Sequence, residues 1–187
     1  DMEVIEAIHQ RRAVRDFTDA PVTADAIELI IAAAIQAPSA VNLQPWLFTV
    51  VRDRRVLDLI SQESKKHMLL GIEAGTVPFA FREHLTNPDF HIFYNAPVLI
   101  LISALKSDAW AAEDASLAAE NLMLAACAKS LGTCWIGFAQ RWLETEEGRR
   151  CVDLPEDYRP VAPIIVGHPR GKAPPVVRKS ANVRWIG

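Results

Sequence analysis

Uncharged polar side chains gather in a short stretch, Gln36–Trp46, that two prolines interrupt. Pro38 ends the apolar-periodic segment before it, because proline lacks an amide proton and disfavours helix in the preceding residue. The hydroxyl and amide groups between the prolines belong to Ser39, Asn42 and Gln44. Uncharged donors and acceptors on such a loop suit a neutral heteroaromatic ring. The alternative is a helix-to-strand connection whose polar side chains bond only to their own backbone.

A second candidate site is basic and lies at Arg11–Phe17, which reads Arg-Arg-Ala-Val-Arg-Asp-Phe. If this segment is extended, Arg11, Ala13 and Arg15 share one face, because side chains alternate along a strand. Two guanidinium groups on one face form a forked donor array that matches phosphate oxygens. The alternative is a solvated basic turn neutralised by the neighbouring aspartates.

Composition narrows the classes of function. Of the 187 residues half are apolar and 23% are charged, which is typical of a globular protein. A net charge of −3 argues against nucleic acid as a partner. Three cysteines without a C-x-x-C pair favour a reducing compartment, and the longest apolar run, Ala96–Ile102, is too short to span a bilayer. With no secretory signal at Asp1–Gln10, we expect a cytoplasmic protein without membrane partners.

The motifs of several common sites are absent from the sequence. There is no G-x-G-x-x-G, G-x-S-x-G or H-E-x-x-H, and the five histidines form no close ligand pair, so we predict no metal site. The acidic pairs Glu113–Asp114 and Glu146–Glu147 are expected on helix surfaces in contact with solvent. If the chain is an enzyme, a bound cofactor must therefore carry its chemistry.

Periodicity and turn signals predict alternating helices and strands in one domain, residues 1–187. Helices are predicted over Met2–Gln10, from Ala24 after an N-cap at Thr23, and over Arg54–Leu70, Asp108–Leu131 and Leu143–Val152. Strands are predicted over Trp46–Val51, Val98–Ile102 and Val161–Val166, with a short strand or turn at Thr133–Phe138. Gly132 is expected to end the longest helix as a left-handed cap. The aromatic-rich Gly71–His91 breaks the pattern and is expected to be an irregular lid or exchanged arm.

Several segments, taken in order, resemble the nitroreductase family of FMN-dependent oxidoreductases in its short form. The most specific segment is P-S-x-x-N-x-Q-P-W, and the likeness extends over nearly the whole chain. The matching segments are Arg11–Phe17, Ala37–Trp46, Leu131–Gly137, Leu154–Tyr158 and Val166–Pro169.

The resemblance implies an α+β fold with three α/β/α layers around a central, mostly antiparallel sheet. It also implies an intertwined homodimer with an FMN at each of two sites lined by both subunits. The helix Asp108–Leu131 would lie in the interface, residues 71–95 would form a lid or excursion, and the C-terminal arm, residues 170–187, would wrap the partner subunit. Such a two-fold interface is isologous.

The resemblance also assigns roles around the flavin. Arg11, Arg12 and Arg15 would hold the phosphate and ribityl chain, and Arg178, with Lys179, would complete the phosphate site. Ala13 stands where the family often has serine, so one hydroxyl contact is lost. From the other subunit the flavin would meet Pro38, Ser39, Ala40, Asn42 and Gln44. A further stretch would run along the isoalloxazine edge and offer backbone amides near N5 and O4. It consists of Cys134, Trp135, Ile136 and Gly137.

The activity implied is reduction of nitroaromatic, quinone or similar organic acceptors by a ping-pong hydride mechanism. NADH or NADPH would be the electron donor, and Phe79, Phe81 and Phe90 are candidates for the substrate wall over the flavin. Two alternatives on the same scaffold are a reductive dehalogenase of iodinated tyrosine and a flavin-fragmenting enzyme. A third is a non-enzymatic FMN-binding module.

Overall fold

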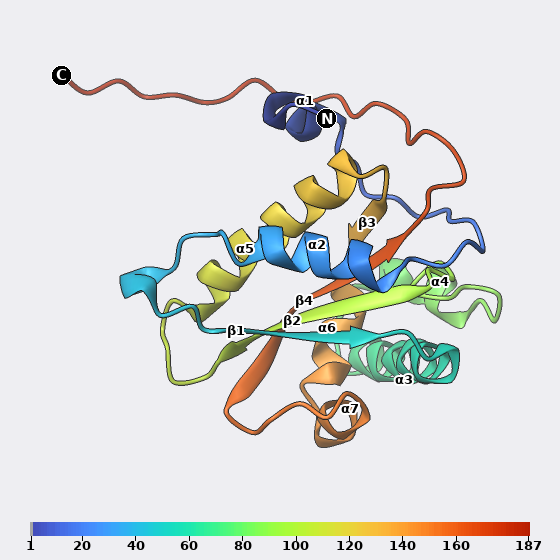
Figure 1. Cartoon of the computed structure of the whole chain (residues 1–187). Helices are drawn as coiled ribbons and strands as arrows, with labels where there is room; N and C mark the ends of the chain where they lie inside the picture. Colours follow the sequence, from blue (N-terminus) through green and yellow to red (C-terminus); the bar gives the residue numbers. More distant parts are fainter. Residues whose placement is uncertain (1) are drawn as a thin grey trace.

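A four-stranded antiparallel sheet forms the centre of the molecule in the computed structural model, which describes residues 2–187 (Figure 1). Its order is β1-β2-β4-β3. The strands are β1 (Trp46–Val51), β2 (Val98–Leu105), β3 (Gly132–Trp135) and β4 (Tyr158–Gly167). The predicted antiparallel sheet is confirmed, with β1 and β3 at its two edges.

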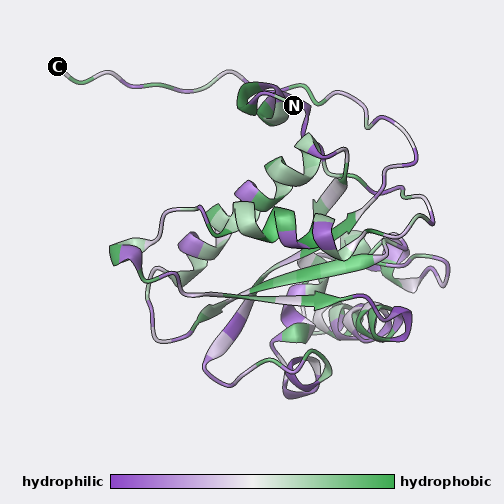
Figure 2. Cartoon of the chain, in the orientation of Figure 1, coloured by the Kyte–Doolittle hydropathy of each residue, from purple (hydrophilic) through white to green (hydrophobic). Residues whose placement is uncertain are grey.

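The central strand β2 is buried on both faces because its sequence is apolar at successive positions. Val98, Ile100 and Ile102 enter one hydrophobic cluster, and Leu99 and Leu101 enter the other. This alternation follows from the period of two along a strand. Figure 2 shows the result, with hydrophobic colour along β2 and hydrophilic colour on the outer helices.

Helices cover both faces of the sheet and make three layers (Figure 1). One layer consists of α2 (Ala24–Ala34) and α5 (Ala111–Ala128). The opposite layer contains α3 (Arg54–Glu73), α6 (Gly137–Leu143) and α7 (Glu146–Cys151). Outside these layers lie α1 (Val4–Gln10) and the 3-10 turn η1 (Ala40–Asn42). The predicted α/β/α layering is therefore confirmed.

The end of the longest helix differs from the prediction. Helix α5 stops at Ala128, and the left-handed residue after it is Ser130, with φ of 59°, rather than Gly132. Gly132 instead begins β3, where a Cβ would lie only 2.8 Å from carbons of Val14. The glycine thus permits close approach of the Arg11–Phe17 segment to the sheet, and the predicted cap was wrong.

Two other predicted elements need correction. Helix α3 continues to Glu73, and the Gly71–His91 region contains η2 (Phe79–Phe81) and α4 (Arg82–Thr86). It packs back on α3, because Val77 and Leu85 join the buried cluster of Met68 and Ile72. The predicted helix Leu143–Val152 divides into the end of α6 and all of α7.

The C-terminal arm, residues 170–187, forms no helix or strand and extends away from the body in Figure 1. Trp185 and Ile186 are 91% and 96% exposed, which is unusual for such apolar side chains. Among residues 2–187 no helix combines the length and the apolar character that crossing a bilayer needs.

Candidate functional site

The arginine segment lies along the outer edge of β3. Ala13 forms a parallel bridge with Thr133, and the Val14 amide donates to the Thr133 carbonyl at 2.9 Å. Phe17 bridges Pro169 and is buried against the end of β4. The segment is extended, as predicted, because it continues the hydrogen bonding of the sheet.

The three arginines of this segment have different surroundings. Arg11 Nε lies 3.3 Å from Glu120 Oε1 on α5. Arg12 folds back, and its NH1 donates to the carbonyls of His9 and Arg11 at 2.6 and 2.7 Å. The Arg15 guanidinium lies 6.0 Å from the centre of the Tyr94 ring. Of the three, Arg15 is the one that lines the cavity beside Cys134.

That cavity has a volume of about 380 Å³ and lies between the β3–α6 connection and the 71–95 segment. Its walls bring Arg15 together with Phe81 and the whole stretch 134–137, all of them predicted site residues. The other lining residues are Met68, Thr76, Val77, Pro78, Ile92, Tyr94, Phe138 and Arg141. The size and the apolar walls suit a small aromatic ligand.

The last residue of β3, Trp135, directs its backbone amide away from the sheet. The Ile136 amide donates to the Pro163 carbonyl of β4, whereas the Thr133 carbonyl accepts from Val14 on the opposite edge. Backbone groups alternate along a strand, so the Trp135 amide points, like the Thr133 carbonyl, away from β4.

Cys134, at the cavity wall, is 3% exposed. Burial raises the pKa of its thiol, and the charges of Arg15 and Arg11 oppose that shift only in part. Cys134 is therefore a neutral thiol at pH 7 and packs as an apolar side chain.

A separate hollow of about 410 Å³ lies beside Arg12, Ala13 and Arg15. Its other wall is the first part of the C-terminal arm, from Gly171 to Val176. Arg178 and Lys179 lie further along the arm and are not among the residues that line this hollow. One chain therefore does not bring the two tail cations to the arginine segment.

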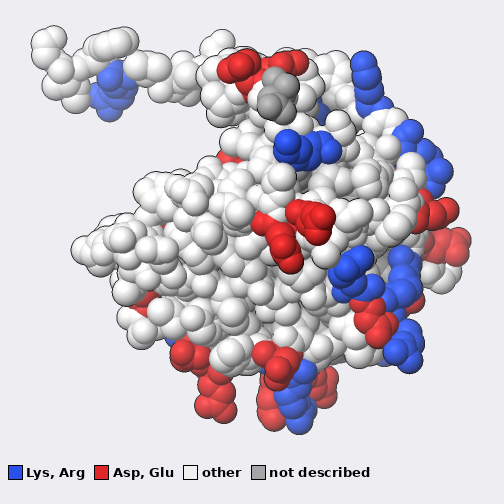
Figure 3. Space-filling model, in the orientation of Figure 1, with Lys and Arg blue, Asp and Glu red and all other residues white. Residues whose placement is uncertain are grey.

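The proline-bounded loop lies at the opposite end of the molecule from β3 (Figure 1). Its Ser39 Oγ accepts from the Gln44 amide at 3.0 Å, and Asn42 Oδ1 accepts from Gln44 Nε2 at 3.2 Å. Val41 has φ of 47° and is 95% exposed. Within one chain, Ser39 and Asn42 thus bond their own loop, in a left-handed backbone that costs strain. Figure 3 shows few charged side chains over this end of the molecule.

A buried carboxylate that the sequence analysis placed on the surface holds this loop. Asp114 is 5% exposed, and its two oxygens accept from the Ala40 amide at 3.2 and 3.0 Å. The prediction that Asp114 contacts solvent was therefore wrong. The signal was available in the spacing, since Ala111 lies three positions before Asp114 and Ala118 four positions after it, and both mark that helix face as buried.

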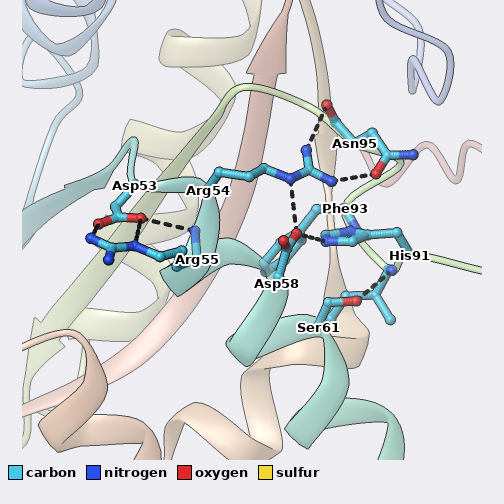
Figure 4. Close-up of polar contacts among 9 residues, drawn as sticks. Asp53, Arg54, Arg55, Asp58, Ser61, His91, Phe93 and Asn95 are labelled. Carbon is cyan, nitrogen blue, oxygen red and sulfur yellow. Dashed lines mark hydrogen bonds and ion pairs between the residues drawn. The ribbon is translucent and has the colours of Figure 1, made fainter.

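A polar cluster fastens the residues around Tyr94 to α3 (Figure 4). His91 Nε2 lies 3.1 Å from Asp58 Oδ1, and His91 Nδ1 accepts from the Phe93 amide, also at 3.1 Å. Arg54 Nε lies 2.8 Å from the same Asp58 oxygen, and Arg54 also bonds the Asn95 side chain. Burial lowers the pKa of His91 despite the nearby Asp58 carboxylate. The cluster thus holds the backbone that presents Tyr94 to Arg15.

The structure places the three predicted substrate aromatics in different surroundings. Phe81 lines the cavity and meets Phe138 edge-on, with ring centres 5.2 Å apart. Phe90 packs edge-on against Phe138 and Tyr94 and is absent from the cavity wall. Phe79 is largely exposed, under the Arg82 guanidinium.

No cluster of three or more metal-ligating side chains occurs in the described part of the chain. The cavity wall offers a ligand two arginines, several aromatic rings and the end of β3.

Comparison with known proteins decides the family. The model of the nitroreductase family matches residues 8–168, which include the arginine segment, the proline-bounded loop and β3. The chain belongs to the nitroreductase family.

Individual members give the same assignment. A relative from Archaeoglobus fulgidus, provisionally named an NADH dehydrogenase/NAD(P)H nitroreductase, is 32% identical over 90% of this chain and 86% of its own. A nitroreductase from Bacteroides fragilis with bound FMN is 27% identical, with a TM-score of 0.79 over 98% of this chain and 96% of its own. An iodotyrosine deiodinase bound to FMN and 3-iodo-L-tyrosine is 25% identical, with a TM-score of 0.80 over 99% of this chain and 100% of its own.

Proposed function

We propose that this nitroreductase-family protein is an FMN-dependent oxidoreductase that uses NAD(P)H to reduce small organic acceptors. The observation that carries the proposal is the cavity shared by Arg15, the 134–137 stretch and Phe81. The family assignment and the FMN bound by the Bacteroides fragilis relative support it. The acceptors are nitroaromatics, quinones or similar compounds, reduced in a ping-pong sequence.

The residues present fit a flavin mononucleotide. Guanidinium groups from Arg11 to Arg15 suit a phosphate, the apolar wall at Ile136 suits a flat ring, and the Trp135 amide suits a ring acceptor. When bound, FMN supplies the electron transfer between NAD(P)H and the acceptor. The chain binds and orients both partners, and Phe81 excludes water from one side of the cavity.

The proposal includes a homodimer in which each site takes residues from two chains. The Pro38–Gln44 loop lies far from Arg15 in one chain, and its exposed Val41 and sparsely charged surroundings suit a protein surface (Figure 3). The extended arm likewise carries apolar Trp185 and Ile186 that one chain leaves exposed. A second copy would cover these groups and bring Arg178, Lys179 and the loop to the flavin, and residues 71–95 would act as the lid.

Purified protein tests the proposal directly. It should be yellow, release free FMN on heating, elute as a dimer, and oxidise NADH or NADPH over many turnovers with menadione or nitrofurazone. Protein that stays colourless with added FMN would refute the proposal. Bound FMN with no turnover would identify a binding module instead.

A second candidate, reductive dehalogenation, is favoured by the similarity to iodotyrosine deiodinase. It predicts iodide release from 3-iodo-L-tyrosine by the reduced flavoprotein. Iodide production slower than menadione reduction by orders of magnitude would leave the reductase as the function.

A further inference from the structure

The cavity next to the β3–α6 connection has charges of one sign. Among residues 2–187, Arg15 and Arg141 are the only charged residues that line it, and no carboxylate of this described part belongs to its wall. None of the ion pairs formed among residues 2–187 involves either arginine. A positive cavity with low-dielectric walls attracts anions.

The two arginines lie on different walls. Arg15 comes from the extended segment beside β3, where the proposed function assigns it to the cofactor. Arg141 lies in the last turn of α6, and its NH1 donates to the Thr76 carbonyl at 3.4 Å, a long hydrogen bond. A guanidinium has five N–H donors, so most of those of Arg141 remain for a ligand.

The rest of the cavity wall is mostly aromatic and apolar. The Phe81 and Phe138 rings meet edge-on, with an interplanar angle of 79°, and Tyr94 faces Arg15. Such walls favour a flat ring, whereas the Arg141 guanidinium favours a carboxylate or sulfonate attached to it. The position and charge of Arg141 distinguish this cavity from a purely apolar pocket.

We propose that Arg141 makes the part of this cavity that bound FMN leaves open, beside Phe81 and Phe138, selective for aromatic acceptors that carry an acidic group, such as a carboxylate. The proposal rests on the proposed oxidoreductase function, because only that function makes the ligand an electron acceptor. The binding preference itself can be measured without turnover. Arg141 acts through its positive charge on the ligand, and Phe81 and Phe138 hold the ring.

Binding of non-reducible ligands to the flavin-loaded protein tests the charge preference. By calorimetry, 2-naphthoate should bind about tenfold more tightly than 2-naphthamide, which has similar shape without charge. In Arg141→Gln the ratio of the two dissociation constants should fall about fivefold, and Arg141→Lys should restore part of it. Arg159→Gln, which removes an exposed charge of β4 outside the cavity wall, is the matched control and should leave the ratio unchanged.

Equal binding of the two ligands, or no binding of either, would overturn the proposal. So would Arg141→Gln weakening both ligands by the same factor, because that is the result of a structural contact with Thr76 alone. The kinetic counterpart compares kcat/KM for 4-nitrobenzoate and 4-nitrobenzamide. If neither is reduced while the naphthoate preference persists, the oxidoreductase function fails and the charge selectivity stands.

Discussion

The two halves of the candidate site differ in how one chain holds them. The first half, the Arg11–Phe17 segment with β3, is fixed by sheet hydrogen bonds and by buried Phe17. The second half, the Pro38–Gln44 loop with the C-terminal arm, is turned outward, and Val41 and Trp185 are more than nine-tenths exposed. The fold therefore completes the first half alone and leaves the second half exposed.

This difference indicates what each half can contribute. A half whose backbone is held by sheet hydrogen bonds can place its side chains at a fixed position for a cofactor, even where a side chain such as Arg15 is itself exposed. In the outward half, side chains such as Val41 stay in contact with solvent unless another surface covers them. The comparison predicts that changes in the first half alter flavin affinity most, and that changes in the second half alter stability and assembly.

The largest expected effect comes from removing the cations of the fixed half. Replacing both Arg11 and Arg15 by Ala should raise the dissociation constant for FMN at least about a hundredfold, since each charged hydrogen bond contributes about 1.5–3 kcal/mol. Fluorescence titration of the apoprotein measures it. The surface pair Arg150→Ala and Arg159→Ala changes the net charge equally and is the control. Unchanged FMN affinity in the variant without Arg11 and Arg15 would mean that the FMN phosphate binds away from these two residues.

The fixed half was the part best predicted from sequence. Arg11, Ala13 and Arg15 have a period of two, and an extended segment is the structure that this period favours. Its position beside β3 is known only from the structure. The different surroundings of the three arginines were not predictable, because Glu120 and Tyr94 lie far away in the sequence. The dense apolar runs of β1, β2 and β4 likewise predicted the sheet. Burial on both faces is reached in β2 and β4, whereas the edge strand β1 is mostly half-buried.

The errors have a shared physical cause in tertiary contacts. Gly132 was expected as a helix cap, whereas the structure uses it for close approach to Val14. The 71–95 segment contains a helix and a 3-10 turn because α3 gives it an apolar surface, which local composition does not reveal. Phe79, Phe81 and Phe90 look equivalent in sequence. In the structure Phe81 lines the cavity, Phe90 packs against Phe138 and Tyr94, and Phe79 is largely exposed.

An intermediate effect is expected from the contact that holds the outward half. Asp114→Ala removes both acceptors of the Ala40 amide and should lower the free energy of unfolding by about 1–3 kcal/mol. Asp114→Asn keeps one acceptor oxygen and should lose less. Urea denaturation measures both, with exposed Glu113→Ala as the control.

Asp114→Ala also sharpens the comparison between the halves. If the loop contacts a second copy, the monomer–dimer equilibrium should shift toward monomer in proportion to the lost stability, as light scattering would show. Equal losses in Asp114→Ala and Asp114→Asn would mean that charge, rather than the hydrogen bond, is what α5 supplies to the loop.

The smallest effect concerns the polar cluster that presents Tyr94 to the fixed half (Figure 4). Burial lowers the pKa of His91 in the folded protein below its ordinary value of 6.5, so the unfolded chain binds the proton more readily. The stability that neutral His91 contributes is complete above pH 6.5 and is lost as pH falls from there through the folded pKa. Protonation of Nδ1 also removes the acceptor of the Phe93 amide. Thermal unfolding between pH 7.5 and 5 should therefore show a smaller acid-side decrease in His91→Gln than in the parent. The exposed His9→Gln should keep the parent's decrease, and identical slopes in all three proteins would show that His91 does not couple this region to pH.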